Sequence, residues 1–113
     1  MKEFMLLFRA DYKNMQSRSP EEWQEMAKKW KDWIAGLSAQ NKWVAAGKQL
    51  SQNGKVVRPN GVTTDGPYVE LKESVNSYCI IKADSLEDAA ELSKNCPILT
   101  VGGTVEIRGI VAS

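Results

Sequence analysis

Residues 3–9 form an almost continuous apolar run that predicts a strand buried on both of its faces. Alternation divides the side chains into two sets, with Phe4, Leu6 and Phe8 on one face and Met5, Leu7 and Arg9 on the other. Ser77–Ala83 predicts a second such strand, because Cys79 and Ile81 alternate with Tyr78 and Ile80. Strands of this kind need cover on both faces, and helices packed on one face leave the other to a partner.

A long amphipathic helix follows the first strand. Ser19 is a typical N-cap, Pro20 suits the first turn, and Glu22 can reach back to the cap nitrogen, so we predict a helix that runs to about Ala39. Its apolar residues recur at spacings of three and four, as expected of a helix laid on a sheet. Trp23, Trp30 and Trp33 belong to this stripe, which packs into a core or lines an aromatic pocket.

The remaining pattern predicts three further strands and one more helix. Trp43–Leu50 and Lys55–Arg58 are predicted strands, joined by a hairpin at Gln52, Asn53 and Gly54 because Asn-Gly favours tight hairpin turns. Ser85 caps a second helix, which Cys96 and Pro97 stop. The last strand is Thr104–Val111, with inward-facing Val105, Ile107 and Val111.

This order of elements predicts a single α+β domain over residues 1–113. Strand, helix, strand with hairpin, strand, helix and strand is the ferredoxin-like pattern, an antiparallel sheet with two helices on one face. The bare face would expose the apolar residues of the two-faced strands. We therefore expect a homodimer that covers this face, since large apolar patches mark interfaces and most homo-oligomers are two-fold symmetric.

Composition excludes several function classes. A formal charge of +1 provides no field for nucleic acid, and no apolar stretch approaches the roughly 20 residues that span a bilayer. No secretion leader opens the chain, so we expect a cytoplasmic protein. The two cysteines, Cys79 and Cys96, lack metal-site spacing and the chain has no histidine. We expect reduced thiols, no metal and no cofactor.

Asp65 is the leading candidate for chemistry. It precedes Gly66 and Pro67, and Pro67 restricts both its own backbone and that of Gly66. A carboxylate held on a stiff turn near an apolar sheet can have its basicity set by partial desolvation, which suits a general acid or base. The alternative is architectural, with the carboxylate capping its own backbone.

The sequence resembles the YCII-related family, in the branch named for its Asp-Gly-Pro-Phe motif. The runs that carry the resemblance are Met1–Phe8, Val56–Arg58, Asp65–Glu73, Tyr78–Ile81, Cys96–Pro97 and Val105–Arg108. The resemblance implies a dimeric α+β barrel with a pocket between sheet and loops. The chain departs from the family at Tyr68, where phenylalanine is usual, at Gly109, where proline is usual, and at Asn76 and Ser77, which replace a glycine pair. The founding branch is associated with a His and Asp pair, of which this chain can supply only the Asp.

Four further side chains are candidates for substrate binding. Arg9, Arg58 and Arg108 lie on predicted strands and could clamp a carboxylate or enolate oxygen, although each could equally be a structural partner of a glutamate. Tyr68 could hydrogen-bond a ligand or plug the edge of a core. Two functions stay open. One is a small cofactor-free lyase or isomerase that uses Asp65 on a cyclic or acidic metabolite, and the other is a non-catalytic dimeric module that binds a small ligand or a protein.

Overall fold

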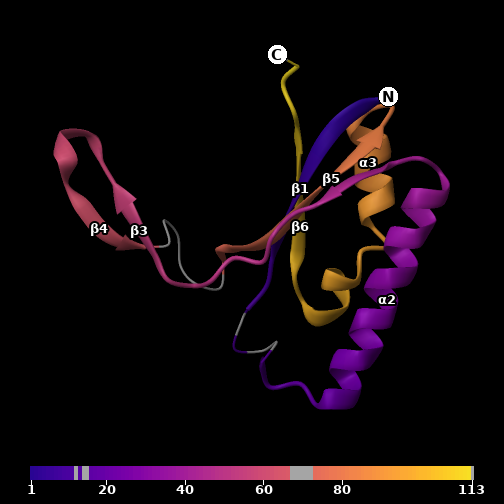
Figure 1. The fold of residues 1–113 in the computed structure, drawn as a ribbon, viewed down its shortest axis with the longest axis horizontal. Coiled ribbons are helices and arrows are strands. Elements are labelled where there is room, and N and C mark those ends of the chain that lie inside the picture. Colours follow the sequence, from indigo (N-terminus) through magenta and orange to yellow (C-terminus); the bar gives the residue numbers. More distant parts are fainter. Residues whose placement is uncertain (12, 14–15, 67–72, 113) are drawn as a thin grey trace.

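The computed structural model of the protein describes residues 1–11, 13, 16–66 and 73–112, and it has an α+β fold (Figure 1). The elements are β1 (Lys2–Arg9), α2 (Pro20–Ala39), β2 (Trp43–Ala46), β3 (Gly54–Val57), η1 (Pro59–Gly61), β4 (Thr63–Gly66), β5 (Val75–Ala83), α3 (Leu86–Ser93), η3 (Pro97–Val101) and β6 (Thr104–Gly109). The main sheet has the order β2-β5-β1-β6, and its pairs are antiparallel. This is the ferredoxin-like arrangement that the sequence predicts.

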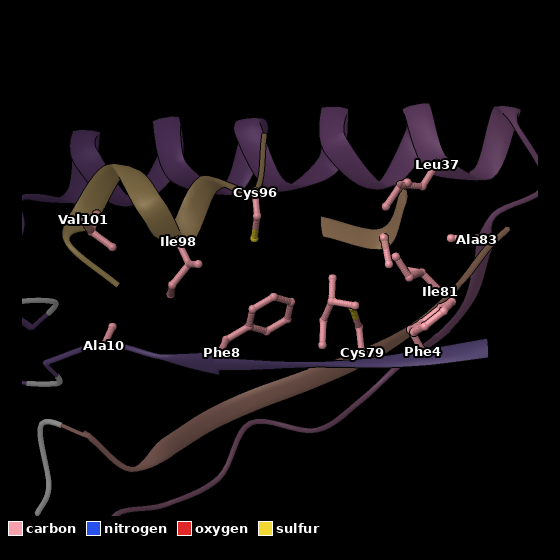
Figure 2. Close-up of a cluster of buried hydrophobic side chains, with 12 residues drawn as sticks. Phe4, Phe8, Ala10, Leu37, Cys79, Ile81, Ala83, Cys96, Ile98 and Val101 are labelled. Carbon is pink, nitrogen blue, oxygen red and sulfur yellow. The ribbon is translucent and has the colours of Figure 1, made fainter. Parts of the chain in front are cut away.

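The core lies between this sheet and the layer formed by α2, α3 and η3 (Figure 2). From β1 it takes Phe4, Leu6 and Phe8, and from β5 it takes Cys79, Ile81 and Ala83, so every second residue of each strand is buried. The alternate residues Met5, Leu7 and Ile80 are only partly buried, because they lie on the opposite face of the sheet. The predicted two-faced character of β1 and β5 therefore holds.

Helix α2 begins and ends where the sequence predicts. The Ser19 side chain accepts a hydrogen bond from the Glu22 backbone nitrogen at 3.2 Å, and the Glu22 carboxylate accepts one from the Ser19 nitrogen at 3.1 Å. This reciprocal capping box satisfies two helix N-terminal donors. The Trp33 indole donates to the Leu92 carbonyl at 3.1 Å, which ties α2 to α3.

The predicted hairpin at Gln52, Asn53 and Gly54 is wrong. β2 pairs with β5, whereas β3 pairs with β4 around a loop at residues 58–62. The chain holds a second Asn-Gly pair in this loop, and Asn60 and Gly61 both adopt positive φ, at 79° and 77°. Such a backbone suits Asn-Gly, and the Arg58 nitrogen closes the loop by donating to the Val62 carbonyl at 2.8 Å. The hairpin of β3 and β4, which we call the arm, projects from the body in Figure 1.

The ends of β2, α3 and β6 differ from the prediction. β2 ends at Ala46, because Gly47 follows and its close approach to Tyr78 permits only a glycine there. Helix α3 ends at Ser93, ahead of Cys96, and Pro97 starts η3, which the pattern did not reveal. Strand β6 ends at Gly109, so Val111 is 89% exposed and does not face inward as predicted.

Both cysteines are buried as free thiols between the layers of the core. Burial raises the pKa of Cys79 to about 12, with a smaller contribution from nearby Cys96, and burial raises the pKa of Cys96 to about 11. The thiolate is the reactive form of cysteine, so both groups are inert at neutral pH. None of the helices within the described residues has the length and apolarity needed to cross a membrane.

Candidate functional site

A cavity of about 540 Å³ opens between α2 and the sheet. Its volume is in the range of small-molecule sites, which run from roughly 300 to 1,000 Å³. The aromatic part of its wall consists of Phe8, Trp23, Trp30, Trp43 and Tyr78, and the aliphatic part includes Met26, Ile34, Leu50, Ile98 and Val101. The lining is predominantly apolar, which suits a ring or another compact hydrophobic group.

The tryptophans of α2 divide between the core and the cavity. Trp33 contacts Phe8 and Trp43 edge to face and does not line the cavity, whereas Trp30 touches Phe8 with ring centroids 5.2 Å apart and also forms part of the cavity wall. Trp23 lies nearer the start of α2 than Trp30. It is 41% exposed and lines the cavity. Trp33 thus packs in the core, whereas Trp23 and Trp30 line an aromatic cavity, so each of the two predicted roles of the stripe applies to part of it.

The end of β2 closes one side of the cavity. The Gly47 nitrogen donates to the Tyr78 carbonyl at 2.9 Å, and a side chain on Gly47 would collide with that carbonyl and with the Tyr78 ring. Ala46, Lys48 and Gln49 line the cavity on either side of this contact. Gly47 therefore holds the chain against β5 at the point where it leaves the sheet.

One polar side chain of the cavity lies where α2 begins. Arg18 lines the cavity directly before the Ser19 cap, and its Nη1 donates to Glu22 Oε2 at 3.3 Å. The Nε atom of Arg18 is buried and has no hydrogen-bond partner among the described residues. The hydrogen bond between the Glu22 carboxylate and the Ser19 backbone is the main reason that the pKa of Glu22 lies below its usual range, so this carboxylate is ionised at neutral pH.

Asp65 lies outside this cavity. It belongs to β4 in the arm, opposite Lys55 in register, and the ladder between β3 and β4 extends to Gly66. The rest of the predicted turn, from Pro67 on, lies outside the described residues. The Asp65 carboxylate is 94% exposed and accepts from Lys55 Nζ at 3.0 Å. Among the described residues that line the cavity, Asp65 is absent.

The candidate arginines do not converge on one point. Arg9 and Arg108 both lie close to Glu106, at 2.5 and 3.7 Å, and Arg9 Nε also donates to the Glu73 carbonyl at 2.9 Å. These contacts match the structural alternative for both residues. Arg58 lies on the arm at the closed end of its loop. Tyr68 lies outside the described residues, and so does Pro67.

A hollow of about 460 Å³ lies beside Arg9 and is lined by Asp11, Glu73 and Thr104 as well. Its wall contains both a cation, Arg9, and the anions Asp11 and Glu73. Groups of three or more potential metal ligands do not occur within residues 1–11, 13, 16–66 and 73–112.

Sequence reasoning missed Arg18 and Lys48. Arg18 precedes a helix cap and Lys48 follows a strand, so neither stands out from a solvated surface charge in the sequence. The one available signal was the position of Arg18, a single residue before the start of a helix whose stripe contains Trp23 and Trp30.

In a comparison with protein families, the model of the YCII-related domain matches residues 3–112 of the chain. The chain belongs to the YCII-related family. This confirms the resemblance seen in the sequence, while the Asp-Gly-Pro-Phe branch stays a prediction. None of the curated proteins matches the chain.

Among solved structures, the chain is similar to 5-chloro-2-hydroxyhydroquinone dehydrochlorinase (TftG) from Burkholderia phenoliruptrix AC1100, in complex with 2,5-dihydroxybenzoquinone. The identity is 15%, the TM-score is 0.42, and the match covers 97% of this chain and 95% of that chain.

Proposed function

We propose that this protein binds a compact cyclic metabolite in the cavity between α2 and the sheet, and that it is a lyase or isomerase of small substrates with Asp65 as the acid–base group. The observation that carries the proposal is the cavity itself, a hollow of about 540 Å³ with aromatic walls. Concave, mostly apolar hollows of this size with a few polar groups at the wall are typical of small-molecule sites. A hollow of this size between helix and sheet is therefore best explained as a place for a ligand.

Asp65 enters the proposal as the carboxylate for proton transfer. An ionised carboxylate can take a proton from a carbon next to a carbonyl group and return it at another position, which is the work of an isomerase, or leave it off while a leaving group departs, which is the work of a lyase. Because Asp65 lies on the projecting arm and does not line the cavity of its own subunit, we propose that it acts on a ligand in the cavity of a partner subunit.

A homodimer is part of the same proposal. The sheet face opposite the helices carries Met5, Leu7 and Ile80, and no described element covers it in Figure 1. An isolated two-stranded hairpin is marginally stable in water, so the arm also needs a surface to pack on. Its exposed Val57 and Val62 are 71% and 55% accessible. A second copy supplies cover for both features at once.

We expect Asp65→Asn to change the free energy of unfolding by less than about 1 kcal/mol, because an exposed ion pair contributes little. Replacing a carboxylate that serves catalysis leaves the stability of the fold almost unchanged, whereas replacing one that supports the structure lowers the stability. Thermal and denaturant melts of Asp65→Asn, Asp65→Ala, Lys55→Gln and the double variant Lys55→Gln/Asp65→Asn give the coupling between the two side chains. A loss of roughly 2 to 3 kcal/mol in Asp65→Asn, with strong coupling to Lys55, would contradict the acid–base role.

The alternative function is a non-catalytic dimer that binds the same class of ligand. The observation that favours it is that Asp65 belongs to the arm and is absent from the described lining of the cavity of its own subunit. Both functions place the ligand in the same cavity, and they differ only in the role of Asp65.

A further inference from the structure

We infer that the cavity selects ring compounds that carry a negative charge, such as an aromatic or alicyclic carboxylate, and that Arg18 is the residue that holds the anionic group. The inference rests on the proposed ligand-binding function and adds the chemical class of the ligand. It also names a specificity residue that lies outside the candidates derived from the sequence.

The charge of the lining supports an anion. Arg18 and Lys48 are the charged side chains among the described residues that line the cavity, and both are cations. The other polar side chains at the wall are uncharged: the amides of Gln16, Gln49 and Asn76 and the hydroxyl groups of Ser77 and Tyr78. A cavity with apolar walls and charges of one sign concentrates the opposite charge, because field lines are focused in a low-dielectric cleft. A cationic ligand would meet repulsion and no compensating carboxylate there.

The bonding of Arg18 supports a role for its guanidinium group in holding the anion. A guanidinium group has five N–H donors in a planar fork, and one nitrogen of Arg18, Nη1, donates to Glu22. The Nε donor is shielded from water and has no partner within the part of the chain that the structure describes, which is unusual for a buried polar atom. A carboxylate oxygen of a ligand satisfies this donor if the Arg18 side chain turns so that Nε faces the cavity. Two oxygens on one carbon also match the spacing of the guanidinium fork.

Glu22 is the competing anion, and its surroundings show why it does not fill this place. Its Oε1 accepts from the Ser19 nitrogen in the capping box, so the carboxylate is held at the start of α2. Its Oε2 lies 3.3 Å from Arg18 Nη1, a long contact, and half of the Glu22 side chain is exposed. Glu22 does not line the cavity. It can therefore hold Arg18 at the start of α2 without occupying the cavity.

The aromatic walls complete the match. Trp23, Trp30 and Trp43 offer flat apolar surfaces to a ring, and Arg18 and Lys48 stand where a charged substituent of that ring could reach them. A ring without the charge would bind through apolar contacts alone, and an anion without the ring would gain little from the walls. The combination predicts selectivity for molecules that have both.

The test uses three probes that share a ring and differ in charge: benzoate, benzyl alcohol and benzylamine. Binding is followed by isothermal titration calorimetry on the full chain and by the emission of the cavity tryptophans, with probe concentrations up to about 10 mM to capture dissociation constants in the millimolar range. We expect benzoate to bind at least about tenfold more tightly than benzyl alcohol, and benzylamine to bind most weakly, since each factor of ten is one charge-assisted contact of ordinary strength.

Arg18→Gln should weaken benzoate binding about tenfold and leave benzyl alcohol within about twofold, because only the anion uses the guanidinium group. Lys28→Gln is the matched control, since Lys28 is an exposed cation of α2 that does not line the cavity. It should leave all three affinities unchanged. A melt of each variant shows whether the fold is retained, and Lys48→Gln gives a second charge removal on a different element.

The outcomes separate the two proposals. If benzoate and benzyl alcohol bind equally well, or if Arg18→Gln and Lys48→Gln both leave benzoate binding intact, the charge selection is wrong while the cavity remains a ligand site. If no probe binds, or if Ala27→Phe, which adds bulk inside the cavity, leaves benzoate binding unchanged, the ligand site itself is wrong. The predicted pattern, with loss in Arg18→Gln and in Ala27→Phe but not in Lys28→Gln, supports both.

Discussion

Leu7→Asp should convert the protein from a dimer into a monomer at micromolar concentration. Leu7 lies on the sheet face opposite the helices, beside Tyr78 on β5 and Glu106 on β6. In the proposed dimer this substitution buries a carboxylate without a cation directly opposite, which costs several kcal/mol, of the order of 3 to 5. Arg9 and Arg108 already pair with Glu106, directly across from Leu7. Light scattering coupled to size exclusion gives the mass.

The matched control is Leu86→Asp. Leu86 opens α3 and is 51% exposed, so the same change of side chain there introduces a carboxylate in water, at a helix start where negative charge is favourable. We expect this variant to keep the mass of the wild type. A wild-type mass close to one chain, or a Leu7→Asp variant that stays dimeric, would contradict the dimer.

Gly47→Ala should lower the free energy of unfolding by about 2 to 3 kcal/mol, as overpacking in a well-packed region does. The new methyl group would collide with the Tyr78 carbonyl and ring, and the carbonyl is backbone that cannot turn aside. Relief requires the chain after β2 to move away from β5, which breaks the hydrogen bond between Gly47 and Tyr78 and changes the wall of the cavity. Chemical denaturation measures the loss.

Gly36→Ala is the opposite case and the natural control. Gly36 lies inside α2 and nothing would touch its added methyl group within 4 Å. The same substitution should therefore raise the stability by about 0.5 to 1 kcal/mol, through helix propensity and reduced freedom of the unfolded chain. Equal effects of the two substitutions would show that the close contact at Gly47 does not constrain the fold.

Local signals explain which elements could be predicted from the sequence. The bounds of α2 follow from Ser19, Pro20 and Glu22 acting within one turn, and the alternation in β1 follows from side chains on a single strand. The hairpin could not be assigned in the same way, because Asn53-Gly54 and Asn60-Gly61 are equally good turn formers. Because β2 pairs with β5, Asn53-Gly54 does not join two paired strands, and the hairpin turn forms at Asn60-Gly61 between β3 and β4.

The candidate site was harder to predict because a cavity is a property of packing between distant segments. Arg18 and Lys48 lie 30 positions apart in the sequence and meet the same cavity only when α2 packs on the sheet. The Asp-Gly-Pro run drew attention to Asp65, which the fold then places on the arm, paired with Lys55. Sequence reasoning thus singled out a run of turn-forming residues, whereas only the three-dimensional arrangement reveals the cavity.

The most direct measurement of the central claim is a crystal structure of the protein after soaking in a mixture of small cyclic metabolites. The account predicts electron density for a ring between α2 and the sheet, in contact with Trp23, Trp30 or Trp43, with a polar substituent near Arg18. A cavity that holds only water after such a soak, or that is closed by the side chains of its own wall, would contradict it.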